Sequence, residues 1–166
     1  MAFLANKQEK IQIEFKNFND FYKDAMNKEI CLYPFDIYAY VDTFDEIEII
    51  NDDLNCLGLI ERYSDIFVIA VHKYLSIERR REILAILFAH FTLHRDYISQ
   101  NRKIEIKNFW TADKMSKEAL NFASKLLMPK ATFITIAREC KTFGELSERF
   151  KVTPKMAKFR FCNVYE

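Results

Sequence analysis

Turn-forming residues are scarce in this sequence, which has two glycines and three prolines among 166 residues. Such a chain has little material for sharp turns or loose linkers, and this favours a compact, helix-rich fold. Apolar runs are also short: the longest, Ile83 to Phe91, is about half of the roughly 20 residues that a membrane-spanning helix needs. The sequence therefore predicts a compact protein without a membrane span.

No charge of one sign dominates, because 25 basic and 24 acidic residues leave a net charge of +1. No field of the whole molecule would draw the chain to nucleic acid or to an anionic membrane. The cysteines form no C-x-x-C pair, and the polar start of the chain lacks the apolar core of a signal peptide. We therefore expect a cytoplasmic protein with reduced thiols.

Apolar residues, in contrast, are abundant: 50% of the chain is hydrophobic and 15% is aromatic. A disordered chain would be poorer in both, and this length suits one domain with a real core. We predict a single domain over residues 1–166, with residues 1–12 loose. Residues 142–163 should form a helix-turn-helix-like element, since Thr142 begins a capping box and Thr153-Pro154 begins another helix.

Three β-branched and aromatic segments with short connections predict a small antiparallel sheet in the form of a meander. They are Glu46–Ile50, Leu57–Tyr63 and Ile66–Val71. The third is apolar throughout, so we expect it to be central and covered on both faces. Weak alternation over Lys103–Phe109 indicates a further edge strand.

Two longer segments have the pattern of helices. Ser76 can cap a helix that runs to His94 and is apolar almost all the way round, which is typical of a buried central helix. Asp113 to Met128 predicts a second helix, and shorter helices are expected at 17–26 and 34–41. The predicted fold is α+β, with a small sheet packed on a buried central helix and surrounded by peripheral helices.

Five segments in this order resemble the ImmA/IrrE family of zinc-dependent peptidases, over about residues 18–163. The most specific is Glu118 to Pro129, which resembles the family pattern E-A-n-x-F-A-x-x-L-L-m-P. The others are Pro34-Phe35-Asp36-Ile37, the hairpin of Leu57–Ile60 with Ile66–Val71, the helix Arg79–His94, and Leu146–Pro154. The resemblance implies a zincin-like fold.

The resemblance also implies where a zinc site would lie. In the family, two histidines at i and i+4 share a zinc ion, and the glutamate after the first histidine is the general base. Here Ile86 takes the first ligand position and Leu87 the general-base position. His90 takes the second ligand position, Glu118 the third, and His94 lies one turn further on.

Since Ile86 offers no lone pair and Leu87 accepts no proton, we expect no catalysis and no zinc cofactor. The leading interpretation is a pseudo-peptidase that binds a protein. The resemblance implies a helix-turn-helix-type transcriptional regulator as partner, because the family's substrates include such repressors, and a mobile-element context would fit. The aromatic and apolar candidates for contact with that partner are Phe109, Trp110, Ile66 and Phe67.

Two alternatives remain open at this point. The first is a zinc peptidase with rearranged ligands, His90, His94 and Glu118, helped by a donor such as Asp113. The plainer interpretation of those residues is a hydrogen bond between His90 and Glu118 in the core, with His94 a cation at a helix end.

The second alternative is a DNA-binding module at the C-terminal element, for which Lys151, Lys155, Lys158 and Arg160 would supply the charge. We do not expect direct DNA binding, because several glutamates lie close by in the sequence. The run Arg79-Arg80-Arg81 is more typical of a solvated helix face.

Overall fold

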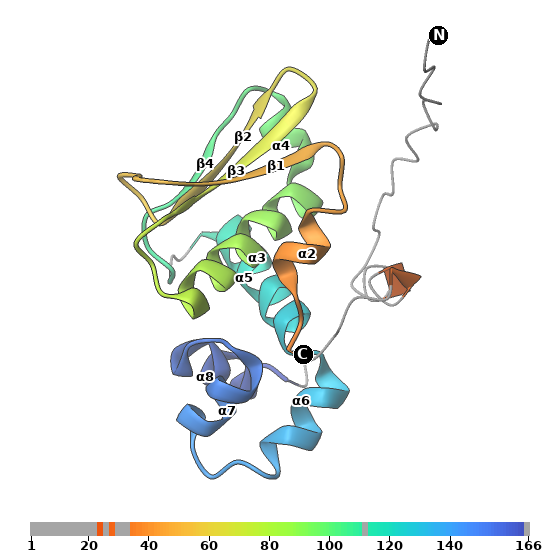
Figure 1. Cartoon of the computed structure of the whole chain (residues 1–166), viewed down its shortest axis with the longest axis vertical. Coiled ribbons are helices and arrows are strands. Elements are labelled where there is room, and N and C mark those ends of the chain that lie inside the picture. The colour runs from red at the N-terminus through yellow and green to blue at the C-terminus, as the bar shows by residue number, and fades with distance from the viewer. Residues whose placement is uncertain (1–22, 25–26, 29–33, 111–112, 165–166) are drawn as a thin grey trace, which may run out of the picture.

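The computed structural model describes residues 23–24, 27–28, 34–110 and 113–164. These residues form seven helices and a four-stranded sheet, so the predicted α+β class is confirmed (Figure 1). The predictions for residues 1–12 and most of the predicted helix 17–26 lie outside the described residues. No helix within the described ranges is both long and apolar enough to cross a membrane.

All the predicted strands form: β1 (Ile47–Asp52), β2 (Gly58–Tyr63), β3 (Ile66–His72) and the edge strand β4 (Ile104–Ile106). Their order is β1-β3-β2-β4, so β3 is central as predicted. The prediction of an antiparallel meander is wrong, because β1 runs parallel to β3 while β2 is antiparallel to both β3 and β4. β3 is the most apolar strand, and it is enclosed because β1 and β2 lie on either side of it. To reach this order, the connection from β1 to β2 passes from one side of β3 to the other.

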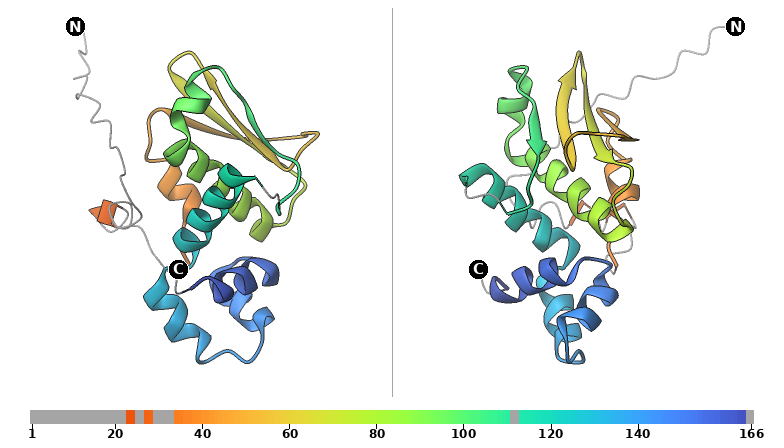
Figure 2. Two further views of the ribbon diagram at one scale, coloured as in Figure 1. Left: turned by 180° about the vertical axis from the view of Figure 1, so that it is seen from behind. Right: turned by 90° about the vertical axis from the view of Figure 1, so that its left-hand side faces the viewer.

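The sheet is covered by helices on one face, where Phe67, Ile69 and Val71 of β3 are buried (Figure 2). The prediction that β3 is covered on both faces is wrong, because Ile66 and Val68 on the other face are only partly buried. Open-face side chains of β3 are therefore shielded mainly by their neighbours in the sheet.

The central helix is α3 (Ile77–Leu93), as predicted. Ser76 caps it by accepting a hydrogen bond of 3.3 Å from the backbone N–H of Arg79, and Glu78 lies in its first turn. Every residue from Glu82 to Phe91 is buried. Such a helix can only be stable in the middle of the molecule, which is where Figure 1 shows it.

Three helices surround α3: α2 (Ile37–Val41), α4 (Arg95–Ser99) and α5 (Lys114–Leu127). Asp36 caps α2, so that helix begins after Pro34 instead of including it. Asp113 caps α5 by accepting from the N–H of Ser116 at 2.9 Å. The short helix α4 was not predicted.

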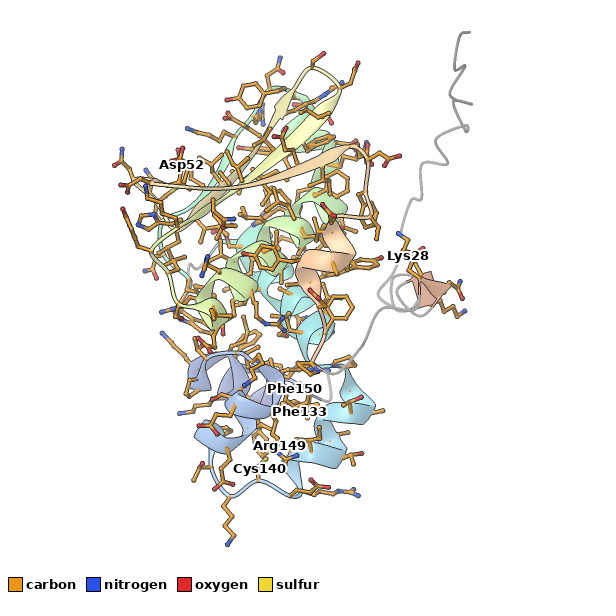
Figure 3. All side chains as sticks on the ribbon, viewed as in Figure 1. Lys28, Asp52, Phe133, Cys140, Arg149 and Phe150 are labelled. Atoms are coloured by element: carbon orange, nitrogen blue, oxygen red, sulfur yellow. The ribbon has the colours of Figure 1, made fainter. Side chains whose placement is uncertain are left out.

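The C-terminal helices are α6 (Lys130–Ala137), α7 (Phe143–Phe150) and α8 (Pro154–Cys162). Half of the predicted capping box is present: the hydroxyl of Thr142 accepts from the N–H of Glu145 at 3.1 Å. The carboxylate of Glu145 accepts from the N–H of Lys141 at 2.8 Å, one residue before the expected donor. The rings of Phe133 and Phe150 pack together with centroids 5.6 Å apart (Figure 3). These helices share their core with the rest of the molecule, because a single hydrophobic cluster of buried side chains runs from Phe35 to Val164.

Two neighbouring residues of α3 fasten the turn between α7 and α8. Glu82 accepts a hydrogen bond of 2.5 Å from the N–H of Thr153, and Arg81 donates to the carbonyl of Lys151 at 3.0 Å. Arg81 also donates to the carbonyl of Phe35 at 2.8 Å, so its guanidinium is held by backbone oxygens. The expectation of a solvated arginine face is therefore wrong for Arg81.

Glu82 offers a test of this attachment. The residue is 0% exposed, its second oxygen has no partner among the described residues, and burial raises the pKa of its carboxyl. The unfolded chain gives up this proton more readily, so Glu82 costs stability as the pH rises above about 4.5. Glu82→Gln keeps the acceptor without the charge, and we expect it to be about 1 kcal/mol more stable at pH 7.

The measurement is urea denaturation of both chains at pH 7 and at pH 4. The gain should shrink towards zero at pH 4, where the native carboxyl is already neutral. Glu78→Gln, one turn earlier and partly exposed, is the matched control and should change little. An equal difference at both pH values would contradict this assignment of the buried charge.

Candidate functional site

The residues predicted to be remnant ligands come together where α3 faces α5. His90 is 2% exposed on α3, the side chain of His94 is 10% exposed at the end of that helix, and Glu118 on α5 is 46% exposed. Nδ1 of His90 lies 3.0 Å from Nδ1 of His94. Nε2 of His94 lies 3.1 Å from a carboxylate oxygen of Glu118. The three side chains form a line from the core to the surface.

This order corrects two expectations. His90 does not bond directly to Glu118, because the ring of His94 lies between them. His94 is accordingly more than a cation at a helix end. It is the C-cap of α3, with φ −125° and ψ 28°, and a residue that leaves the helix in this way can turn its ring back across the preceding turn.

When Glu118 is ionised, the hydrogen bonds among His90, His94 and Glu118 determine which ring nitrogens carry a hydrogen. A carboxylate only accepts, so Nε2 of His94 donates to Glu118. The other nitrogen of a neutral His94 then accepts, so Nδ1 of His90 donates to it. His90 is left with its lone pair on Nε2, and this nitrogen is the hydrogen-bond acceptor that the line presents.

Burial, reinforced by the charge of His94 and opposed by that of Asp113, lowers the pKa of His90 to about 4. The imidazole of His90 therefore stays neutral in the native chain at a pH near 6.5, where the same group in the unfolded chain takes up a proton. Stability should fall as the pH is lowered from 6.5 towards 4, by up to roughly 3 kcal/mol. Histidine NMR should show the His90 ring unchanged down to about pH 5.

His90→Gln should flatten that part of the pH–stability curve, measured by denaturant unfolding. His72→Gln removes a histidine from the end of β3 and serves to assign the NMR signals. Titration of the His90 ring near pH 6.5 would show that the side chain is solvated.

The two apolar residues at the catalytic positions differ in where they point. Ile86 is 4% exposed and lines a small cleft together with His90. Leu87 is 0% exposed and packs beneath β2, so close that a Cβ added to Gly58 would lie 2.9 Å from its Cδ1. Leu87 is thus a core residue beneath the sheet.

The cleft between β4, α3 and α5 is narrow and mostly apolar. Its cavity volume is about 30 Å³, well below the roughly 150 Å³ of a cavity that binds a benzene ring. Besides Ile86 and His90, its lining includes Ile106, Phe109 and Leu120. This space is too small to admit the side chain of a peptide substrate.

The residues present do not fit a catalytic zinc ion. Such a site needs three protein donors converging on one point about 2 Å away. His94 faces His90 with one nitrogen and Glu118 with the opposite one, so the three candidate ligands do not converge. Within the described ranges, no three His, Cys, Asp or Glu side chains are grouped to hold a metal. Asp113, the additional donor considered, caps α5.

The aromatic candidates for partner contact are divided by the fold. Phe109 lines the cleft at 6% exposure. Trp110 lies instead against α8, with its ring centroid 5.5 Å from that of Phe159 and the Lys155 ammonium 4.5 Å above it. Both residues pack inward, so neither is a ready anchor for a partner.

The remaining two candidates lie on β3. Phe67 is 2% exposed and its ring packs edge-on against Phe91 at 5.0 Å, so its side chain belongs to the core and offers no exposed surface to a partner. An apolar central strand buries its inward side chains, and the sequence pattern did not show which face was inward. Ile66 is partly exposed at the start of β3, apart from the residues that line the cleft.

The C-terminal element does not present all its basic residues to solvent. Arg160 is 2% exposed and donates to the carbonyl of Met128 at 3.0 Å, and burial lowers its pKa to about 10. Lys151, Lys155 and Lys158 are exposed, although the Lys155 ammonium lies over Trp110. Arg160 is therefore a structural residue, and the charge available to DNA is smaller than the sequence indicated.

Sequence reasoning missed two polar residues on the rim of the cleft, Asn108 and Ser116. Asn108 follows β4, and Ser116 lies in the first turn of α5. They come from different segments, and no motif surrounds either of them. The only signal in the sequence was their closeness to Phe109 and Glu118, two residues already singled out.

Comparison with models of known protein families gives a match. The model of the Peptidase_M78 family, described as IrrE N-terminal-like domain, matches residues 57–161. The matched range runs from just before β2 to the end of α8 and contains the whole cleft. No curated protein matches the chain.

Proposed function

Since the chain belongs to the Peptidase_M78 family, that of the IrrE N-terminal-like domain, we propose that it is a non-catalytic member that acts by binding a protein. The family resemblance makes a helix-turn-helix-type transcriptional regulator the natural partner. Binding without cleavage requires that the partner reach the cleft and that no nucleophilic water be activated there.

The observation that carries this proposal is the side chain of Ile86 beside His90 in the cleft. A histidine at that position would complete the i and i+4 pair, whereas isoleucine fills the space with apolar atoms. Leu87, buried beneath β2, leaves no carboxylate to accept a proton from water. Loss of a general base alone typically lowers a rate by a factor of about 10² to 10⁴.

The binding surface in this proposal is the rim of the cleft. Asn108 and Ser116 supply polar contacts on its two sides, and Glu105 adds a carboxylate at the β4 edge that is already paired with Lys103. A water molecule in the cleft would link Nε2 of His90 to the partner, with the orientation of the ring fixed by His94 and Glu118. An extended segment laid along β4 would meet all of these groups, and strand addition of this kind holds a peptide without cutting it.

The test is a binding measurement between the purified chain and a helix-turn-helix regulator encoded beside its gene. Fluorescence anisotropy gives the affinity, and mass spectrometry of the regulator shows whether it is shortened. We expect binding with the regulator intact. Ser116→Arg, which places a bulky cation on the rim, should weaken binding at least tenfold.

Thr135→Arg, on the exposed surface of α6, is the matched control and should bind like the original chain. Metal analysis of the purified protein is run in parallel. A regulator that is cut, together with one zinc ion per chain that is lost in His90→Ala, would establish the peptidase with rearranged ligands instead. Equal binding by the two arginine variants would remove the cleft from the interface.

A further inference from the structure

The outer edge of the first strand pairs with no strand in the part of the chain that the structure describes. β1 is the outermost strand on the side opposite β4, and it pairs only with β3 among the described strands (Figures 1 and 2). Carbonyl groups of Glu46 and Asp52 accept from β3 and the residue after it, at 2.7 and 2.9 Å. In a parallel pair the bonding groups alternate along the strand. The backbone groups of Ile49 and Asn51 therefore point away from the sheet.

Acidic residues surround this edge. Residues 42–53 contain Asp42, Asp45, Glu46, Glu48, Asp52 and Asp53 and no basic residue. Glu46 is paired with Arg95, and Asp53 lies 3.8 Å from Lys73. Glu48 and Asp52 are exposed and have no ion pair with any residue that the structure describes. Figure 3 shows Asp52 at the outer end of the sheet.

The two edges of the sheet differ in charge: the β4 edge carries both signs, whereas the β1 edge carries acidic residues alone. At β4, Glu105 is paired with Lys103 at 2.6 Å and lies 3.5 Å from Lys107, so that edge is short and its charges are balanced. β1 is twice as long and carries one sign of charge. Ile50, between the two acidic residues on the open face, is 37% exposed.

The negative charge along β1 determines which kind of strand can pair with its outer edge. A second copy of β1 paired with the first would bring Glu48 and Asp52 of both chains close together, and like charges across a strand pair are destabilising. A strand with basic side chains would instead neutralise them. Edge strands with free backbone groups take up such segments by strand addition, in which backbone bonds give affinity and side chains give specificity.

We propose that β1 binds an extended, basic segment of another protein as a fifth strand of the sheet. The side chains of β1 determine which residue types the bound segment should carry at each position. Lys or Arg stands opposite Glu48 and Asp52, and apolar residues stand opposite Ile49 and Ile50. An antiparallel segment therefore reads basic, any, apolar, apolar, basic. This surface lies at the opposite edge from the cleft and does not depend on the function proposed there.

The probe is a fluorescent eleven-residue peptide with Lys-Thr-Val-Val-Lys at its centre, titrated into the full chain at low salt. Amide hydrogen exchange measured by NMR should show new protection at Ile49 and Asn51. A peptide with glutamates in place of both lysines should bind at least tenfold more weakly. Glu48→Lys combined with Asp52→Lys should reverse this preference.

An N-methylated form of the basic peptide, with the backbone N–H groups that face β1 blocked, separates strand addition from simple charge attraction. If it binds as well as the parent peptide, the proposal is overturned. Removing residues 1–16, which contain the alternating run Lys10 to Lys16, tests the chain's own segment as occupant. Tighter peptide binding after this removal, or a dimer in sedimentation, would assign the edge to this chain. Ser116→Arg should leave peptide binding unchanged, so failure here is distinct from failure at the cleft.

Discussion

Replacing Leu87 with glutamate will lower the free energy of unfolding by about 3–5 kcal/mol, the range expected for an unpaired carboxyl placed in a core. The position is 0% exposed, lies under β2 and belongs to the buried hydrophobic cluster of the core. The glutamate of an active family member would stand at this position. In this chain it would be a buried acid beneath the sheet.

Urea denaturation of three variants measures the effect. Leu87→Met preserves the volume and should cost less than about 1.5 kcal/mol. Ile86→His, at a residue that lines the cleft, should cost less than Leu87→Glu. The double variant Ile86→His, Leu87→Glu restores the H-E-x-x-H letters, and we expect it to be unstable and to cleave nothing. A stable double variant that binds zinc and cuts a regulator would show that the scaffold still supports the chemistry.

The second large effect is expected at Gly58, where β2 passes closest to α3. A Cβ there would lie 2.5 Å from Cγ2 of Ile83 and 2.9 Å from the carbonyl oxygen of Ala70. Backbone cannot yield as a side chain can, so Gly58→Ala should lower the free energy of unfolding by about 1–3 kcal/mol.

The other glycine is the natural control. A Cβ at Gly144, in α7, would come no nearer than 3.6 Å to its neighbour, Oγ1 of Thr142. Gly144→Ala should therefore stabilise the chain by about 0.4–1 kcal/mol, because alanine loses less backbone entropy on folding into a helix. Melting temperatures of the two variants should move in opposite directions. If both move the same way, the close approach of β2 to α3 is not what limits position 58.

Local signals in the sequence were sufficient for most elements. Ser76, Thr142 and Thr153 each cap the helix that their position predicted, because capping is a short-range interaction between a side chain and the next turn. Asp113, predicted as the first residue of its helix, is the residue that caps it. The apolar run of α3 likewise predicts burial without any knowledge of its neighbours. The family match covers four of the five segments that carried the resemblance, and Pro34-Phe35-Asp36-Ile37 lies before the matched range.

Long-range geometry could not be predicted in the same way. The parallel pairing of β1 with β3 depends on which side of β3 the chain chooses, and the short connection permitted either. The position of His94 between His90 and Glu118 depends on how α3 ends, a detail of two backbone angles. The outward direction of Glu48 and Asp52 required the register of the whole sheet.

The attachment of the α7–α8 turn to α3 has a consequence for how the molecule comes apart. Val152 and Met156, on either side of Thr153, are buried in the same hydrophobic cluster as α3, and the N–H of Thr153 bonds to Glu82 inside that helix. Removing α6, α7 and α8 would therefore leave the Glu82 carboxylate without its hydrogen-bond partner. It would also expose apolar side chains of the core to water. The α7–α8 pair is therefore part of the core that stabilises the fold. A regulator bound to this pair would act directly on α3, the helix that carries His90.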